Sequence, residues 1–315
     1  MGRYVLRRLV LALPVLLGVS AAVFLMLHVL PADPIHVMLT QTSSGQVPSA
    51  AATDEMIRQL QRQLGLDQPL PVQYLRFVER LAHGSLGEST RTHREVLLEI
   101  AERFPYTLAL ALGAVTLSTV VGVGLGILAA INRGRAGDHV TMGIAIVGLS
   151  VPTFLLAIVG IIVFSLALHW LPVTGARTWQ SYILPIVALS LHSAAVKARI
   201  TRSSMLEVLG QEYLRTARAK GLRERLVILR HALKNALIPV TTIVGLQFGA
   251  LLGGAFIIEN IFGWPGIGRL ATQAIFNRDF PVVQGTVLVG AVTFALANLA
   301  VDLLYAWLDP RIRYS

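Results

Sequence analysis

The sequence predicts an all-α membrane protein with about six transmembrane helices and with both termini in the cytoplasm. Three observations lead to this fold class. The 315 residues are 54% hydrophobic and only 14% charged, whereas soluble domains carry about 25% charged residues. Several apolar stretches approach the length of about 20 residues that a helix needs to cross a bilayer. Lys and Arg residues gather in alternate connections between these stretches, as in cytoplasmic loops.

The composition also excludes several classes of protein. The chain has no cysteine, which excludes disulfides, cysteine-ligated zinc and thiol nucleophiles. Its net charge of +10 would favour nucleic-acid binding only on a basic face of a soluble domain, and here the cations lie between apolar stretches. The basic residues before Leu9 imitate a secretory signal, but the run Leu9–Leu30 is too long for one. We expect this run to remain as the first membrane helix.

Six spans are predicted, because a helix is the open-ended element that satisfies its own backbone hydrogen bonds in lipid. Tyr182–Val196 is the weakest of them, since it is short and is followed closely by charged residues. The predicted spans are Leu9–Leu30, Phe104–Ile131, Val140–Leu168, Tyr182–Val196, Ala236–Ile258 and Val282–Leu308.

The distribution of Lys and Arg residues predicts how the chain is oriented in the membrane. With all six spans kept, one side of the membrane collects 17 of the 27 Lys and Arg residues. Omitting Tyr182–Val196 would remove this asymmetry. The positive side is the cytoplasmic one, and both termini therefore lie there.

The outer loop Pro31–Arg103 is too long for a simple connection. Thr53–Leu64 begins with a residue suited to cap a helix, and its apolar residues have helical spacing. Leu70–Leu81 repeats that pattern. We expect a small external helical cap without a core of its own.

The inner loop Lys197–Lys234 carries ten of the cations. Helical spacing runs through Tyr213–Lys220 and ends at Gly221, and a second amphipathic turn, Leu226–Leu233, leads into the next span. Such a basic loop can simply face lipid headgroups. The small residues Thr216, Ala217 and Ala219, however, would let a partner approach closely, and glycine permits a sharp turn. The sequence therefore favours a helix–glycine–helix elbow that docks a partner.

Several segments resemble the membrane subunits of type I ABC importers, in the dipeptide, oligopeptide and nickel branch. The resemblance covers essentially the whole chain. Arg215–Leu222 and Arg230–Pro239 look like that branch's form of the coupling loop, although Arg215-Thr216-Ala217 replaces the Glu-Ala-Ala of the wider superfamily. The other matching segments are Pro31–Pro34, Leu64–Pro69, Glu259–Gly268, Arg278–Pro281 and Leu308–Arg313.

The resemblance divides the chain into four parts. It implies a first transmembrane helix (1–30), an extracytoplasmic cap region (31–103), a five-helix core of the type I importer kind (104–309) and a cytoplasmic tail (310–315). The core would contain the coupling loop, 197–236. We expect the residues that contact the ATPase to be Glu212, Tyr213, Arg215, Thr216, Ala217, Arg218, Ala219, Lys220, Gly221, Leu222, Arg230 and His231.

The same resemblance implies the partners. A second homologous permease chain would complete the pathway in the bacterial inner membrane, two ATPase subunits would drive it, and an extracytoplasmic binding protein would deliver cargo. The chain has no Gly-x4-Gly-Lys-Ser/Thr loop, so we expect no catalysis and no cofactor here, with ATP and magnesium on the ATPase subunits. No nucleic acid is implied.

A gate or translocation pathway is a further hypothesis. Glu259–Gly268 could re-enter the membrane or could be a plain surface loop, and Asp302 is an ionisable group within a span. Proline residues in the spans could be hinges, but they are common there. The glycine residues Gly122, Gly124 and Gly126 favour close helix packing instead. The candidate pathway residues are Glu259, Asn260, Phe262, Trp264, Pro265 and Asp302.

Other functions fit less well. A membrane enzyme would need a nucleophile with its base, or metal ligands, and no such motif occurs. A secondary transporter would need buried carboxylates, and only Asp302 is available. The resemblance favours di- or oligopeptides as cargo, and it leaves nickel chelates, glutathione and other small solutes open.

Overall fold

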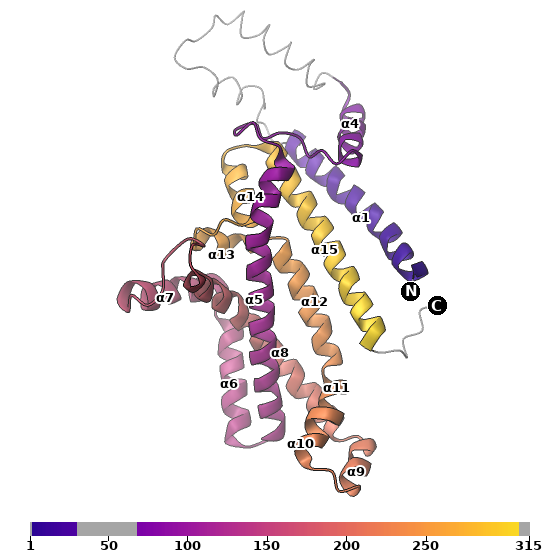
Figure 1. Ribbon diagram of the computed structural model, residues 1–315, viewed down its shortest axis with the longest axis vertical. Helices are drawn as coiled ribbons and strands as arrows, with labels where there is room; N and C mark the ends of the chain where they lie inside the picture. The colour runs from indigo at the N-terminus through magenta and orange to yellow at the C-terminus, as the bar shows by residue number, and fades with distance from the viewer. Residues whose placement is uncertain (1, 30–67, 309–315) are drawn as a thin grey trace, which may run out of the picture. The chain divides into compact units, whose positions relative to one another are not determined.

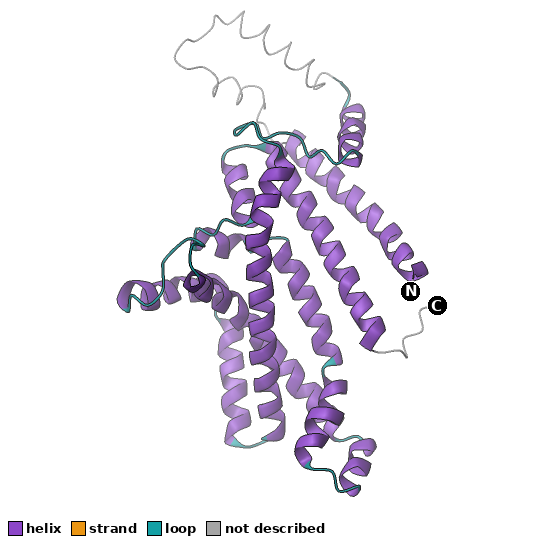
Figure 2. Ribbon diagram, in the orientation of Figure 1, coloured by secondary structure: helices purple, strands orange, loops and turns teal. Residues whose placement is uncertain are grey.

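The computed structural model describes residues 2–29 and 68–308, and within these ranges the regular structure is helical (Figure 2). A single isolated bridge pairs Glu88 with Glu95. The first helix, α1, spans Gly2–Val29. The predicted external helix Thr53–Leu64 lies outside the described residues. Its predicted neighbour Leu70–Leu81 is confirmed as α4, Leu70–Ala82.

Figure 1 shows the order of the remaining elements. They are α5 (Val96–Ile131), α6 (Ala136–Ser150), α7 (Thr153–Gly160), the π-helix η1 (Ile161–Ala167), the 3-10 helix η2 (Trp179–Tyr182), α8 (Ile183–Leu209), α9 (Glu212–Ala219), α10 (Glu224–Leu226), the π-helix η3 (Val227–Ala232), α11 (Leu233–Ala236), α12 (Ile238–Leu252), α13 (Phe256–Ile261), α14 (Ile267–Phe276) and α15 (Phe280–Leu308).

The described residues divide into two units. The first contains the residues up to Phe104 together with Leu270–Val292, and the second contains Pro105–Arg269 together with the residues from Thr293.

The first unit packs around an aromatic cluster. Phe24 of α1 stacks on Phe77 of α4 with 5.9 Å between ring centroids, and Leu288 is buried against them. The Tyr74 hydroxyl donates to the backbone oxygen of Leu17 at 3.2 Å, which also ties α4 to α1. The apolar face predicted for Leu70–Leu81 is therefore the face that α4 buries.

The second unit centres on α8, which contacts α6, α7 and α12. Ala157, Leu184, Ala188, Ile258 and Phe262 form one of its buried clusters. A bidentate ion pair also joins α6 to α8, because Arg202 donates to both oxygens of Asp138 at 2.6 and 2.7 Å.

Three described helices are each long and apolar enough to cross a membrane, and two bent helix pairs bring the candidate spans to five if each pair counts as one span. The three helices are Val96–Ile131, Trp179–Leu209 and Phe280–Ala300. The predicted first span corresponds to a shorter apolar stretch, Val10–Leu25, within α1. The bent pairs are Ala136–Ser150 with Thr153–Ala167, and Glu224–Ala236 with Ile238–Leu252.

The predicted third span is broken. Val140–Leu168 does not form one helix, because α6 and α7 meet at an angle of 97°. The break lies at Val151 and Pro152, where Val151 has an extended backbone with φ −90° and ψ 124°. Proline lacks the N–H that would continue the helix, and it drives the preceding residue out of the helical region.

The fourth and fifth spans also differ from the prediction. The helix predicted to end at Val196 continues as α8 to Leu209. The helix predicted over Ala236–Ile258 ends at Leu252, and Gly254, with φ +111°, separates α12 from α13. Glycine can take this conformation, and a β-carbon on Gly254 would lie only 3.0 Å from the α-carbon of Gly268.

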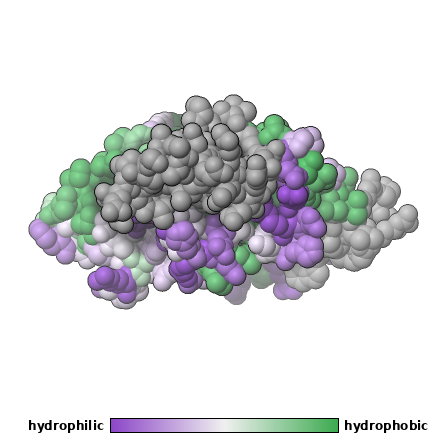
Figure 3. All heavy atoms as spheres, turned by 90° about the horizontal axis from the view of Figure 1, so that it is seen from above, coloured by the Kyte–Doolittle hydropathy of each residue, from purple (hydrophilic) through white to green (hydrophobic). Residues whose placement is uncertain are grey.

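Large apolar side chains are exposed on the helices that would face lipid. Val120 of α5 and Val147 of α6 are 68% and 63% exposed. Hydrophobic residues also lie at the surface in the view of Figure 3, beside hydrophilic ones. Exposed apolar surface of this extent is typical of chains embedded in a membrane or in a larger complex.

Close packing explains some of the glycines within the spans, as predicted. A β-carbon on Gly122 would lie 2.6 Å from the backbone oxygen of Ala194, and one on Gly126 would lie 2.6 Å from that of Ala198. These two glycines let α5 approach α8 along one face. Gly124 is different, because nothing lies within 4 Å of its β-position.

Candidate functional site

The segment from Glu212 to Ala236 forms the elbow that the sequence predicts. A short helix, α9, follows α8 after Gly210, and the chain then turns at Gly221 into α10, η3 and α11, which lead to α12. Figure 1 shows α9 and α10 beyond α11 and the end of α12. The elbow is therefore a structured projection.

Gly221 ends α9 by a defined hydrogen-bond pattern. It has φ +76°, and its N–H donates to the backbone oxygen of Arg218 at 2.9 Å. The N–H of Leu222 donates to the backbone oxygen of Ala217 at 3.4 Å. These two bonds form a Schellman motif, in which glycine supplies the left-handed residue.

A bidentate ion pair spans the turn. Arg218 of α9 donates to both carboxylate oxygens of Glu224 in α10, at 2.9 and 3.1 Å. This hydrogen bonding raises the pKa of Arg218 and lowers that of Glu224. Both side chains are partly exposed, so the pair contributes mainly to the direction of the turn.

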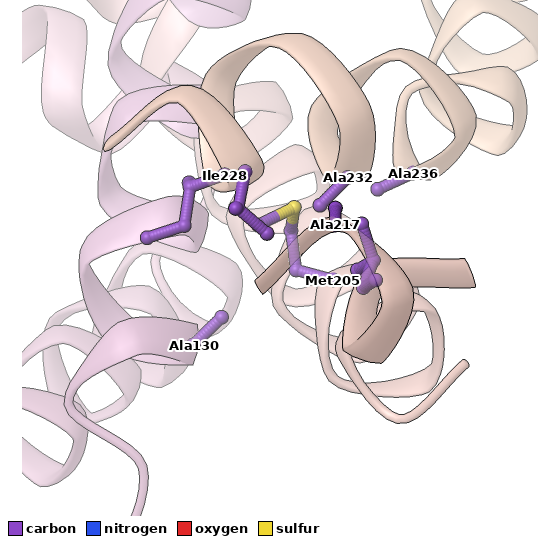
Figure 4. Packing of buried hydrophobic residues seen from close by; sticks show 8 residues of the cluster. Ala130, Met205, Ala217, Ile228, Ala232 and Ala236 are labelled. Atoms are coloured by element: carbon purple, nitrogen blue, oxygen red, sulfur yellow. The ribbon is translucent and has the colours of Figure 1, made fainter. Parts of the chain in front are cut away.

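The inner side of the elbow is apolar and packed. Leu214 and Ala217 of α9 are buried together with Met205 of α8 and with Val227 and Ala232 of η3. Figure 4 shows Ala217 and Met205 pointing toward Ala232, while Ala130 of α5 joins the cluster on the side of Ile228. Burying a leucine contributes about 1.5–3 kcal/mol. The inner side of α9 is therefore packed against α8 and η3.

A polar contact adds to this packing. The Asn235 side-chain amide donates to the Tyr213 hydroxyl at 2.8 Å, and that hydroxyl lies 3.4 Å from the backbone oxygen of His231. Tyr213 of α9 is thus bonded to α11, directly before α12. The sequence alone does not single out Asn235, Leu214 or Met205, although the three-residue spacing of Leu214 and Ala217 indicates that these two share a face.

Most of the predicted docking residues are exposed, but Ala217 and His231 are not. Ala217 does not share an exposed face with Thr216 and Ala219, because helical geometry turns it to the side of Leu214 and into the buried cluster. His231 is half-buried. The exposed residues are Glu212, Tyr213, Arg215, Thr216, Arg218, Ala219, Lys220, Gly221, Leu222 and Arg230.

The segment Glu259–Gly268 forms a second feature, a tight turn between α13 and α14. Trp264 and Glu259 are completely buried and Phe262 is nearly so. The Trp264 ring meets that of Tyr182 edge to face at 4.5 Å, and its Nε1 donates to the backbone oxygen of Tyr106 at 3.1 Å. The alternative that this segment is a plain surface loop is therefore wrong.

The buried Glu259 carboxylate has hydrogen-bond donors around it. It accepts from the backbone N–H of Arg269 and the hydroxyl of Thr107, both at 2.9 Å. Burial raises the pKa of this carboxyl, and these hydrogen bonds act in the opposite direction. A β-carbon on Gly266 would overlap the carboxylate, which explains why glycine stands there.

The remaining pathway candidates have different surroundings. Asn260 is exposed and Pro265 is half-buried. Asp302 lies in α15, and its side chain is outside the part that the structure describes. The contacts of Glu259 and Trp264 give these two a packing role in this conformation, and their place on a pathway stays a prediction.

Lys197 has an environment that differs from the prediction. The sequence predicts that Lys197 begins the inner loop, but this residue lies within α8 and is completely buried. The prediction is wrong because the helix continues past Val196. The small and apolar residues on both sides of Lys197, Ala194–Val196 and Ala198, were the available signal.

Comparison with known proteins agrees with these features. Residues 122–314 match the family described as the binding-protein-dependent transport system inner membrane component, and residues 1–111 match the N-terminal family of such membrane components. The glutathione transport system permease protein GsiC of Escherichia coli (strain K12) is 45% identical over 315 residues, covering 100% of both chains. The GsiC protein of Salmonella typhi is also 45% identical over 315 residues, with the same complete coverage.

Solved structures share the fold at low sequence identity. An inward-facing conformation of the MetNI methionine ABC transporter matches with a TM-score of 0.54 and 18% identity, over 68% of this chain and 97% of that one. An amino acid ABC transporter crystallised with histidines matches with a TM-score of 0.50 and 19% identity, over 69% of this chain and 95% of that one. The resemblance to the dipeptide, oligopeptide and nickel branch is confirmed by the full-length relatives. The chain belongs to the family of inner membrane components of binding-protein-dependent transport systems and is a membrane permease subunit of an ABC importer.

Proposed function

We propose that this chain forms, with a second permease subunit, the inner-membrane pathway for a small peptide, and that its elbow receives the force of ATP hydrolysis. The packing of α9 supports this proposal most directly. Leu214 and Ala217 fix the inner side of α9 to α8 and η3, while its outer side exposes charged and small residues. A rigid element can transmit a displacement that a flexible loop would absorb.

The exposed side of the elbow suits a protein partner. Arg215 and Glu212 form an ion pair at 2.9 Å on the outer surface of α9, where both are mostly exposed. Thr216 and Ala219 lie exposed on the same short helix. Their small side chains leave room for the ATPase surface to approach. In this proposal both termini and the elbow lie in the cytoplasm, on the positive side of the membrane.

The ATPase subunits, in this proposal, hold ATP and magnesium, and this chain has no catalytic role. An extracytoplasmic binding protein delivers the cargo. Peptide cargo is supported by the family branch, and glutathione, a tripeptide, is the first cargo to test because GsiC is named for its transport. Nickel chelates and other small solutes are the alternatives.

The cargo can be tested with the complete transporter in liposomes. ATP inside the vesicle and binding protein outside it should drive uptake of labelled glutathione. A dipeptide should compete with glutathione if the pathway accepts peptides generally. ATP-driven uptake of a nickel chelate without glutathione uptake would replace the peptide assignment. Uptake driven by an ion gradient without ATPase subunits would contradict the importer mechanism.

The elbow can be tested with a matched pair of variants on α9. Ala217→Leu enlarges a side chain in the buried cluster, whereas Ala219→Leu makes the same change at an exposed position. We expect Ala217→Leu to displace α9 from its packing against α8 and η3. Ala219→Leu should interfere only with docking of the ATPase. Gly221→Pro should abolish ATP-driven uptake with membrane insertion intact, because proline cannot adopt φ +76°. Unchanged uptake in Gly221→Pro would contradict the docking role.

A further inference from the structure

A completely buried lysine joins three helices of the second unit. The Lys197 ammonium of α8 donates to the Ser118 hydroxyl at 2.7 Å, the Thr119 hydroxyl at 3.0 Å and the Gln247 side-chain oxygen at 2.5 Å. Ser118 and Thr119 belong to α5, and Gln247 belongs to α12. An ammonium has three donors, so each N–H has one acceptor.

The close approach of α5 and α8 makes this arrangement possible. Gly122 lies one turn after Ser118 and faces Lys197, since a β-carbon there would be 2.8 Å from the Lys197 β-carbon. Gly126 makes the next close contact, against Thr201. These glycines bring the helix backbones together, and the hydroxyls of Ser118 and Thr119 then reach the ammonium.

The charge of Lys197 is held by neutral oxygens. No ion pair among the described residues includes Lys197. A hydrogen bond to a charged group is stronger than one between neutral groups, and an uncompensated buried charge is strongly unfavourable. The three acceptors therefore stabilise Lys197 only while α5, α8 and α12 keep this spacing.

The elbow lies between α8 and α12, the helices that carry Lys197 and its acceptor Gln247. The C-terminal end of α8 leads into α9, and α11 leads from the elbow into α12. A displacement of the elbow that moves α8 relative to α12 must change the distance between Lys197 and Gln247. Their hydrogen bond is therefore sensitive to the motion that the ATPase would impose.

We propose that Lys197 is a positioning residue that holds α5, α8 and α12 together in this conformation and releases Gln247 when the transport cycle moves α8 relative to α12. We call Lys197, Ser118, Thr119 and Gln247 the Lys197 latch. This inference rests on the proposed function, because the latch opposes the movement of α8 relative to α12 that the ATPase drives through the elbow. Breaking the latch should let ATP hydrolysis proceed without cargo.

The test uses the complete transporter, with both permease chains, the ATPase subunits and the binding protein, in liposomes. ATP hydrolysis is measured without binding protein and cargo, and labelled glutathione uptake is measured with both. Lys197→Met keeps the length of the side chain and removes its donors. We expect the unstimulated ATP hydrolysis of each folded transporter to rise about tenfold, the equilibrium change for the loss of one hydrogen bond to a charged group, with fewer glutathione molecules imported per ATP.

A second substitution makes the opposite prediction. Gln247→Glu places a carboxylate against the ammonium, and it should strengthen the contact by forming a buried ion pair. We expect both unstimulated hydrolysis and uptake to fall in this variant. Gln247→Met should instead raise unstimulated hydrolysis, and it keeps the proposal testable if Lys197→Met does not fold. The double variant Lys197→Met/Gln247→Met should match Lys197→Met alone, because both remove the same contact.

Ser190→Ala is the matched control. Ser190 is also a buried polar residue of α8, but its hydroxyl donates to the backbone oxygen of Val187 in its own helix. A purely structural role for Lys197 would lower the amount of folded transporter without raising hydrolysis per folded molecule, and that result would overturn the latch. Failure of the wild-type transporter to couple ATP to uptake of any tested cargo would instead contradict the proposed function.

Discussion

The Thr107 hydroxyl in α5 donates a hydrogen bond of 2.9 Å to the buried carboxylate of Glu259, which stands 152 residues later in the chain. The same hydroxyl accepts the backbone N–H of Ile267 at 2.9 Å. One small side chain thus holds α5 to both sides of the turn between α13 and α14. This relationship connects a membrane helix with the segment that the sequence marks as a candidate gate.

Thr107→Val should destabilise this joint. Valine has nearly the shape of threonine but offers no hydroxyl, so the N–H of Ile267 would be left without this acceptor and Glu259 would lose a donor. We expect a loss of about 1–3 kcal/mol, seen as a lower melting temperature of the purified transporter. Thr107→Ser keeps the hydroxyl and is the control. Equal melting temperatures for the two variants would show that the hydroxyl contributes nothing.

The glycines of α5 provide a comparison within one helix. Gly122→Ala should force α5 away from α8, because the new β-carbon would lie 2.6 Å from the Ala194 backbone oxygen. Overpacking of this kind costs about 1–3 kcal/mol. Gly124→Ala should have no such cost, since its β-position has nothing within 4 Å, and alanine favours helix formation. Thermal melting of both variants measures the difference, and an equal loss in both would refute close packing at Gly122.

The ion pair of Asp138 and Arg202 should contribute to stability more than an exposed pair does. Asp138 is 4% exposed and Arg202 is 28% exposed, and two hydrogen bonds join them. The carboxylate also accepts the backbone N–H of Gly134 at 3.0 Å. In a double-mutant cycle of Asp138→Asn and Arg202→Gln we expect a coupling energy on the order of 1–3 kcal/mol. Additive effects would mean that the pair is not energetically coupled.

Tyr213→Phe should weaken the connection between α9 and α11. It removes the hydroxyl that accepts from Asn235 at 2.8 Å and leaves the ring in place. Because this contact is partly exposed, we expect a modest loss of about 0.5–1.5 kcal/mol. Uptake per ATP should fall more than stability if the contact transmits movement. Asn235→Leu should give the same ratio of uptake to ATP hydrolysis, and a normal ratio in both variants would assign the contact to packing alone.

The sequence predicts local features well where one residue type decides the backbone. Helical spacing is predicted to end at Gly221 in the inner loop, and α9 ends there. Glycine permits a positive φ without help from the rest of the chain. Pro152 breaks a helix for a similarly local reason, although the span around it is predicted as continuous. The helix Leu70–Ala82 was predictable for a similar reason, because its apolar spacing marks the face that it buries.

Side chains that obtain their partners from distant helices were not predictable in this way. Lys197 ends an apolar run in the sequence, and cations usually end membrane spans, yet Ser118 and Gln247 supply its acceptors within the second unit. Ala217 has the small side chain of a docking surface, but its helix turns it toward Met205. Such outcomes depend on which helices become neighbours.

The sequence by itself determined the membrane class, the helical fold, the family resemblance and the position of the elbow, because composition, apolar length and special backbone residues act locally. Only the tertiary structure decided that Lys197 and Glu259 are buried and hydrogen-bonded and that α9 is fixed to its own chain. The physical reason is that burial and hydrogen bonding of a polar group depend on atoms brought together from far apart in the chain.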